Sequence, residues 1–329
     1  MRSKAASAAA CTLSGGNDDH VTIVARVPMR TRLNEFRSNS PAAQPTSKIA
    51  MTSMDAMRTT LVVAMLFTAL AAMGSTPDTP APPPDAFEVT VPGCALNMVF
   101  VKVPTKAGED PRWVSQTEIT WDAYDAMVYR LDQEDPAAEP TDGLTRPTKP
   151  YIMADRGWGH AGFPALSVSH NGAKAFCVWL GAKVKGSFRL LTVREWTALA
   201  KGSGITPDNL DEHCWHKKTS KRRKTQAVGT KKADANNLHD LFGNVSEWCL
   251  VDGTQGADMV LMGGHFKQNP ENQTADERKE PTPAWNDTDP QIPKSIWWLS
   301  DAPFAGFRVA CTRPPAGAKP IQLNKGETP

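Results

Sequence analysis

The sequence predicts one α+β domain, low in regular secondary structure, over residues 87–313. One β-branched run indicates a strand, and three short apolar periodicities indicate three short helices. Most of the remaining residues lack long periodic runs, so we expect short strands and long ordered loops. All ten tryptophans lie between Trp113 and Trp298. Each covers a large area, which suits the core of such a loop-rich fold.

The first predicted elements are a strand at residues 98–103 and a helix after Thr120. The strand segment reads Met-Val-Phe-Val-Lys-Val, which is rich in β-branched residues. Thr120 is suited to cap a helix, because its hydroxyl can accept from a first-turn amide. The helix presents an apolar face at i, i+3, i+4 and i+7, made of Tyr124, Met127, Val128 and Leu131.

Two further helices are predicted, one near Ser169 and one after Thr192. The apolar face of the first consists of Ala173, Phe176, Cys177 and Leu180. The segment Thr192-Val193-Arg194-Glu195 is typical of a capping box, in which residues 192 and 195 bond each other's backbone amides. Trp196, Leu199 and Ala200 are expected to face the core, and Gly202 to end the helix.

The composition is that of an ordinary globular chain. It is 40% hydrophobic and 22% charged, which excludes a wholly disordered, collagenous or coiled-coil protein. The formal net charge of +2 argues against a dedicated nucleic-acid binder.

Residues 57–74 predict a secretory signal peptide. Arg58 gives a positive start, an apolar run extends from Leu61 to Ala72, and Ala72-Met73-Gly74 supplies a small-x-small end. The run is shorter than the roughly 20 residues of a membrane span, so cleavage is favoured over an uncleaved anchor. We therefore expect a secreted or periplasmic protein without a stable membrane span after cleavage.

The other flanking segments predict no packed structure. Residues 1–56 are expected to be an over-long start, with translation beginning at Met51, Met54 or Met57, or else a disordered extension. Residues 75–86 predict a proline-rich linker, and residues 314–329 a disordered tail.

Six segments recur in the order of a known family. They are residues 113–120 (WVSQTEIT), 164–180 (PALSVS to AKAFCVWL), 189–196 (RLLTVREW), 238–248 (LHDLFGNVSEW), 262–266 (MGGHF) and 306–308 (GFR). This order resembles the formylglycine-generating enzyme, or sulfatase-modifying factor, domain family. Residues 145–151 (TRPTKPY) are similar to secreted bacterial members, particularly planctomycete-like ones. The resemblance implies a modified C-type-lectin-like fold that is low in regular secondary structure.

The resemblance also implies an activity whose metal ligands this chain lacks. Enzymes of the family oxidise a sulfatase cysteine to formylglycine, using copper held by two cysteines. An ungapped count from Gly263-Gly264 puts Gln268 and Gln273 at those positions, and no cysteine lies between Cys249 and Cys311. Amide oxygen is a poor substitute for thiolate toward Cu(I), so copper is not expected.

Two classes of function remain open. A non-catalytic recognition domain is favoured, and the alternative is a sulfatase-activating oxidoreductase or another superfamily enzyme with a divergent site. By resemblance, the candidates for lining the family's cleft are Ser246, His265, Gln268, Gln273 and Trp285.

The resemblance places a Ca²⁺ ion on the segment around residues 240–247. Its ligands would be the Asp240 and Glu247 carboxylates and the Gly243 and Val245 carbonyls. Ca²⁺ takes six to eight oxygen ligands, which this set and water can supply. The alternative is a tight turn in which the two carboxylates make caps or ion pairs.

The cysteines and a basic run complete the predictions. In the family the cysteine matched by Cys177 often forms a disulfide, but the ungapped partner position holds Arg278, so we expect Cys177 to be a buried small hydrophobe or to pair elsewhere. Residues 217–232 carry eight Lys and Arg and no acid, which predicts a solvated loop or a polyanion site. The expected partner is an extracytoplasmic protein, a peptide or a polyanionic glycan, and not a nucleic acid.

Overall fold

The computed structural model describes residues 84–110, 112–133, 146–254 and 258–323. The predicted extension (1–56), the signal peptide (57–74) and most of the linker fall outside these ranges, and so do residues 324–329 of the predicted tail. In the described ranges no helix combines the length and the apolar character needed to cross a membrane.

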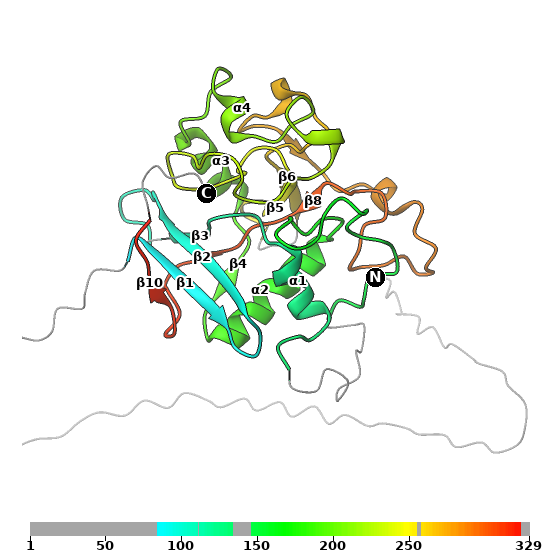
Figure 1. The fold of residues 1–329 in the computed structure, drawn as a ribbon, viewed down its shortest axis with the longest axis horizontal. Coiled ribbons are helices and arrows are strands. Elements are labelled where there is room, and N and C mark those ends of the chain that lie inside the picture. Colours follow the sequence, from blue (N-terminus) through cyan, green and yellow to red (C-terminus); the bar gives the residue numbers. More distant parts are fainter. Residues whose placement is uncertain (1–83, 111, 134–145, 255–257, 324–329) are drawn as a thin grey trace, which may run out of the picture. The chain divides into compact units, whose positions relative to one another are not determined.

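A six-stranded antiparallel sheet contains the predicted strand (Figure 1). Its order is β10 (Lys319–Pro320), β1 (Ala86–Val91), β2 (Leu96–Val103), β3 (Arg112–Ser115), β9 (Ala310–Cys311) and β4 (Phe188–Arg189). Strand β2 confirms the prediction for residues 98–103 and begins two residues earlier. In the β1–β2 register Phe87 faces Phe100, and their rings stack 5.1 Å apart.

A second, four-stranded sheet follows later in the chain. Its order is β7 (Arg278–Lys279), β6 (Met259–Met262), β5 (Ser246–Leu250) and β8 (Ala305–Gly306). Strand β5 pairs antiparallel with β6 and parallel with β8. This places the Glu247 position of the predicted calcium segment at the centre of the sheet, between Met262 and Gly306.

The first predicted helix is confirmed as α1 (Trp121–Val128), with Thr120 accepting from the Ala123 amide. Its predicted face is wrong at one position, because Leu131 lies beyond the helix and is 52% exposed. The helix ends at a cap on Tyr129, and Arg130 then adopts a left-handed conformation (φ 57°). The chain therefore turns away before the i+7 position can reach the core.

The second and third helices are also confirmed, as α2 (His170–Val184) and α3 (Val193–Gly202). Helix α2 lies against β1 and β4, and α3 lies against β5 and β6. Both hydrogen bonds of the capping box between Thr192 and Glu195 are present, and Gly202 is the last residue of α3. A fourth helix, α4 (Leu210–His213), was not predicted, because a four-residue helix is too short to show a periodicity. Three 3-10 turns, η1 (Lys221–Arg223), η2 (Pro270–Asn272) and η3 (Pro283–Asn286), complete the helical elements of the described residues.

The predicted ends of the domain need two corrections. Ala86, assigned to the linker, is the first residue of β1. Lys319 and Pro320, assigned to the tail, pair with Glu88 and Phe87, and the Ile321 amide donates to the Ala86 carbonyl. A proline is tolerated there because β10 is an edge strand, where one face of the backbone needs no partner.

The tryptophans form much of the core, as the sequence predicts. Seven of the ten are buried: Trp113, Trp121, Trp179, Trp196, Trp248, Trp297 and Trp298. One apolar cluster lies around α1 and α2 and includes Trp121, Trp248 and Trp298. A second lies around α3 and includes Trp196.

Candidate functional site

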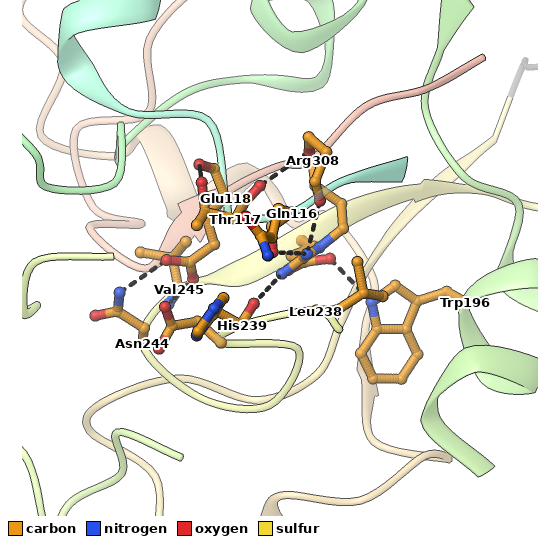
Figure 2. Close-up of polar contacts among 12 residues, drawn as sticks. Gln116, Thr117, Glu118, Trp196, Leu238, His239, Asn244, Val245 and Arg308 are labelled. Atoms are coloured by element: carbon orange, nitrogen blue, oxygen red, sulfur yellow. Dashed lines mark hydrogen bonds and ion pairs between the residues drawn. The ribbon is translucent and has the colours of Figure 1, made fainter. Parts of the chain in front are cut away.

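A buried ion pair joins Arg308 to Glu247, and Figure 2 shows Arg308 among its polar contacts. Both side chains are 1% exposed, and Arg308 Nε donates to Glu247 Oε1 over 2.7 Å. The other oxygen, Glu247 Oε2, accepts from the Trp196 indole nitrogen at 3.0 Å. Both oxygens of the predicted calcium ligand Glu247 are therefore engaged by protein donors.

The Arg308 guanidinium also bonds the backbone of two other segments (Figure 2). It donates to the Ser115 carbonyl in β3 at 3.1 Å and to the His239 carbonyl at 2.9 Å. Burial lowers its pKa, but the Glu247 carboxylate beside it, together with the charges of Glu118 and Asp240, outweighs burial and holds the pKa above the ordinary value. The arginine of the last family motif thus stays charged and joins the two sheets.

A second carboxylate, Glu118, lies near this ion pair and was not predicted as a site residue. It accepts from the Val245 amide at 2.8 Å and from the Asn244 side-chain amide at 2.7 Å (Figure 2). Burial, then the neighbouring charges of Asp240 and Glu247, raise its pKa well above the ordinary value. The available sequence signal is its place in the first family motif, 126 residues before Asn244.

Of the two carboxylates predicted to bind calcium, only Asp240 has an oxygen without a hydrogen-bond partner. Asp240 Oδ2 accepts from the Gly229 amide at 2.8 Å, while its buried Oδ1 has no hydrogen-bond partner. Three carboxylates, at residues 118, 240 and 247, gather around one guanidinium, and burial raises the pKa of Asp240. Raised pKa values favour the neutral carboxyls, and the described residues contain no group of three or more His, Cys, Asp or Glu side chains placed to hold a metal ion. Glu247 also makes the ion pair that the alternative interpretation expects, so calcium binding stays a prediction.

The two residues at the expected copper positions take part in side-chain packing. Gln268 Nε2 donates to Glu277 Oε1 at 2.6 Å. Gln273 is 6% exposed, its Nε2 donates to the His265 carbonyl at 3.3 Å, and its Oε1 accepts from the Cys214 thiol at 3.8 Å. Gly264, at φ +72°, leaves room for this amide, because a Cβ there would lie 2.4 Å from Gln273 Oε1.

The other three candidate cleft residues lie around the same segment. Ser246 Oγ donates to the Gly264 carbonyl at 2.7 Å. His265 stacks on Phe304 with 4.6 Å between ring centroids, and Trp285 meets the same phenylalanine edge-on at 5.6 Å. Burial, then the charges of Lys279 and Lys267, lower the pKa of His265 to about 3, so this histidine is neutral. The structure therefore brings the five candidates together, although Ser246, His265 and Gln273 are buried.

A cavity of about 660 Å³ lies between helices α3 and α4 and the loop that contains η2. Gln273 lines it, and Phe242, Ile205 and Leu210 supply apolar walls. This volume is in the range of small-molecule pockets. The cavity could not be predicted from the sequence, because its walls come from separate segments of the chain.

The cysteines in the described ranges, Cys94, Cys177, Cys214, Cys249 and Cys311, are all free thiols. Cys177 is buried on α2 and packs as a small hydrophobe, which was one of its two predicted states. Burial raises the pKa of Cys177 and of Cys311 to about 12. Both therefore remain protonated and unreactive at neutral pH.

Comparison with known proteins identifies the family. Among solved structures, Treponema denticola variable protein 1 (20% identity, TM-score 0.48) matches over 70% of this chain and 100% of its own, and PvdO from Pseudomonas aeruginosa (20%, 0.45) over 70% and 99%. CarF (17%, 0.43) matches over 70% and 98%. No curated protein matches the chain. The profile of the sulfatase-modifying factor enzyme 1-like domain matches residues 88–290, more than half of the chain. The chain therefore belongs to the sulfatase-modifying factor (formylglycine-generating enzyme-like) domain family and has its α+β fold.

Proposed function

We propose that this chain is a non-catalytic recognition domain built on the sulfatase-modifying factor fold. The observation that carries the proposal is the presence of Gln268 and Gln273 where the family resemblance expects two copper-binding cysteines. Cu(I) selects soft thiolate donors, and a neutral amide offers only a hard oxygen.

The surroundings of the two glutamines support the same proposal. Gln273 is held by the His265 carbonyl and the Cys214 thiol, and Gln268 is held by Glu277. Cys214 is the thiol beside position 273, but burial, then the Asp240 charge, raise its pKa well above the ordinary value. A protonated thiol is neither a metal ligand nor a nucleophile, so it does not replace the expected cysteines.

A binding role suits the other features of this region. The cavity beside Gln273 has the volume of a small-ligand pocket, and Gln268 and Trp285 are half-exposed at the surface of the same region. The predicted signal peptide would expose these features to extracytoplasmic partners. The partner is then an extracytoplasmic protein, a peptide or a polyanionic glycan.

The proposal is tested by incubating the purified full chain with a Cys-x-Pro-x-Arg peptide, with and without copper. Mass spectrometry then measures the aldehyde product. We expect no aldehyde above the background set by a peptide whose cysteine is replaced by serine. Copper-dependent aldehyde formation would overturn the non-catalytic role and support a sulfatase-activating oxidoreductase.

A further inference from the structure

We propose that the loop after Cys214 carries a binding surface for a sulfated polysaccharide. The basic surface consists of six side chains: Lys217, Lys218, Lys221, Arg222, Arg223 and Lys224. The inference rests on the recognition role proposed above, and it names the chemical class of the ligand.

The structure separates the eight cations of residues 217–232 into two groups. Lys232 pairs with Glu212 at 2.7 Å, and Lys231 lies 4.4 Å from the centre of the Trp215 ring and donates to the Asp211 carbonyl. The six cations of the basic surface, in contrast, have no carboxylate partner among the described residues. Five of them are exposed and Lys224 is half-buried. Their charge is therefore available to an anionic ligand.

The loop that carries the basic surface is held in place from beneath. His216 is fully buried, and its Nε2 lies 2.7 Å from Asp211 Oδ1. Ser220 Oγ donates to the Phe266 carbonyl at 3.1 Å, and the Lys217 amide donates to the Gln268 carbonyl at 2.9 Å. A tethered loop presents its charges with little ordering cost on binding, which favours affinity.

The tightest part of the loop presents two arginines in succession. Arg222 and Arg223 have φ angles of 57° and 51°, a left-handed conformation that non-glycine residues seldom adopt. Both side chains are exposed. Such strain persists only where the surroundings impose it, and it is concentrated at functional sites. Guanidinium groups suit sulfate and carboxylate because they can donate two parallel hydrogen bonds.

The basic surface adjoins the glutamine segment. The two hydrogen bonds to the Phe266 and Gln268 carbonyls join the loop directly to residues 266–268. Lys267, in the same segment, lies 5.1 Å from the centre of the Trp158 ring. An anion bound to the basic surface would therefore lie beside Gln268, one of the two positions where the family resemblance expects copper ligands.

The neighbouring side chains favour a polysaccharide over other polyanions. A membrane surface calls for apolar side chains beside the cations, and the large exposed apolar residues, Leu131, Met153, Val178, Ile292 and Ile296, all lie outside this loop. Single-stranded nucleic acid calls for open aromatic faces, but residues 217–224 contain no aromatic side chain, and a lysine ammonium lies over one face of Trp215 and of Trp158. A sulfated polysaccharide needs neither feature, because repeated anionic groups carry its binding.

The test compares two charge-matched triple variants of the full chain for binding to heparin by calorimetry. The first is Lys221→Gln, Arg222→Gln and Arg223→Gln. The control is Lys106→Gln, Arg313→Gln and Lys319→Gln, three exposed cations outside the loop. Each lowers the formal net charge by three, from +2 to −1.

We expect the loop variant to lose about tenfold or more in affinity, with a shallower salt dependence, and the control to stay close to wild type. The charge-keeping variant Lys221→Arg, Arg222→Lys, Arg223→Lys should retain binding, which guards against misfolding as the cause. Equal losses in the two Gln variants would overturn the proposal, and so would equally tight binding of DNA or of phosphatidylserine vesicles. The aldehyde assay tests the non-catalytic role separately, so failure of either proposal is recognisable.

Discussion

Acidification should destabilise this domain through His265. The buried imidazole has its pKa lowered from 6.5 to about 3, by burial first and then by Lys279 and Lys267. Between these two values the unfolded chain binds a proton that the folded chain does not. Stability is therefore fully present above pH 6.5 and is lost as the pH falls toward 3.

The size of the effect follows from the two pKa values. At pH 5 the unfolded imidazole is almost fully protonated and the folded one is neutral, which costs about 2 kcal/mol relative to pH 7.5. Urea unfolding of the wild type at pH 7.5, 6.5, 5.5 and 5.0 measures this loss, together with that of other titrating groups.

The variant His265→Gln isolates the contribution of this one side chain. It removes the titration, so its loss of stability from pH 7.5 to pH 5 should be smaller than that of the wild type by about 2 kcal/mol. A lower stability of the variant at pH 7.5 is expected, because the stacking on Phe304 is lost. Parallel pH dependences for the two proteins would refute the reasoning.

Three further predictions concern the polar centre and α3. Arg308→Met should lower the free energy of unfolding in urea by about 3–5 kcal/mol, because it leaves the Glu247 carboxylate unpaired in the core. Adding Glu247→Gln should restore part of this loss. A loss as small as that of the exposed control Arg313→Met would contradict a stabilising ion pair. Thr192→Ala should lower the free energy of unfolding by about 1 kcal/mol, because it removes the N-cap of α3. The exposed Thr312→Ala is the control, and a loss for Thr192→Ala of only a few tenths of a kcal/mol would contradict the prediction. If calcium binds at Asp240, EDTA should lower the melting temperature of the wild type and leave that of Asp240→Asn unchanged. An unchanged melting temperature of the wild type would refute calcium binding.

Helices α1, α2 and α3 and strand β2 could be predicted, because their capping residues and apolar patterns lie within a few residues of one another in the sequence. Leu131 was misplaced because the left-handed turn at Arg130 depends on the tertiary surroundings, and no pattern marks it. The pairing of Lys319 and Pro320 with β1 was missed for a similar reason. Strand pairing across more than 200 residues leaves no short-range signal in one sequence.

The candidate site was predictable only as far as the family motifs carry it. The motifs led to residues 240–247 and to the glutamines, and the structure brings the five candidate cleft residues together. The role of Glu118 and the splitting of the basic run into paired and unpaired cations both depend on contacts between distant segments. The sequence shows how many cations residues 217–232 contain, but only the structure shows that Lys231 lies over the Trp215 ring and that Lys232 pairs with Glu212.

The contacts of Arg308 bear on how the domain loses its structure. The Arg308 guanidinium bonds Ser115 in β3 of the first sheet, Glu247 in β5 of the second sheet and the loop at His239. Trp196, in the second apolar cluster, donates to the same Glu247 carboxylate. If one of the two apolar clusters unfolded alone, Arg308 or Glu247 would lose its partner and be left as an unpaired charge in the part that stays folded. That penalty couples the two halves, so unfolding of the described domain should be a single cooperative transition, with calorimetric and van't Hoff enthalpies in agreement.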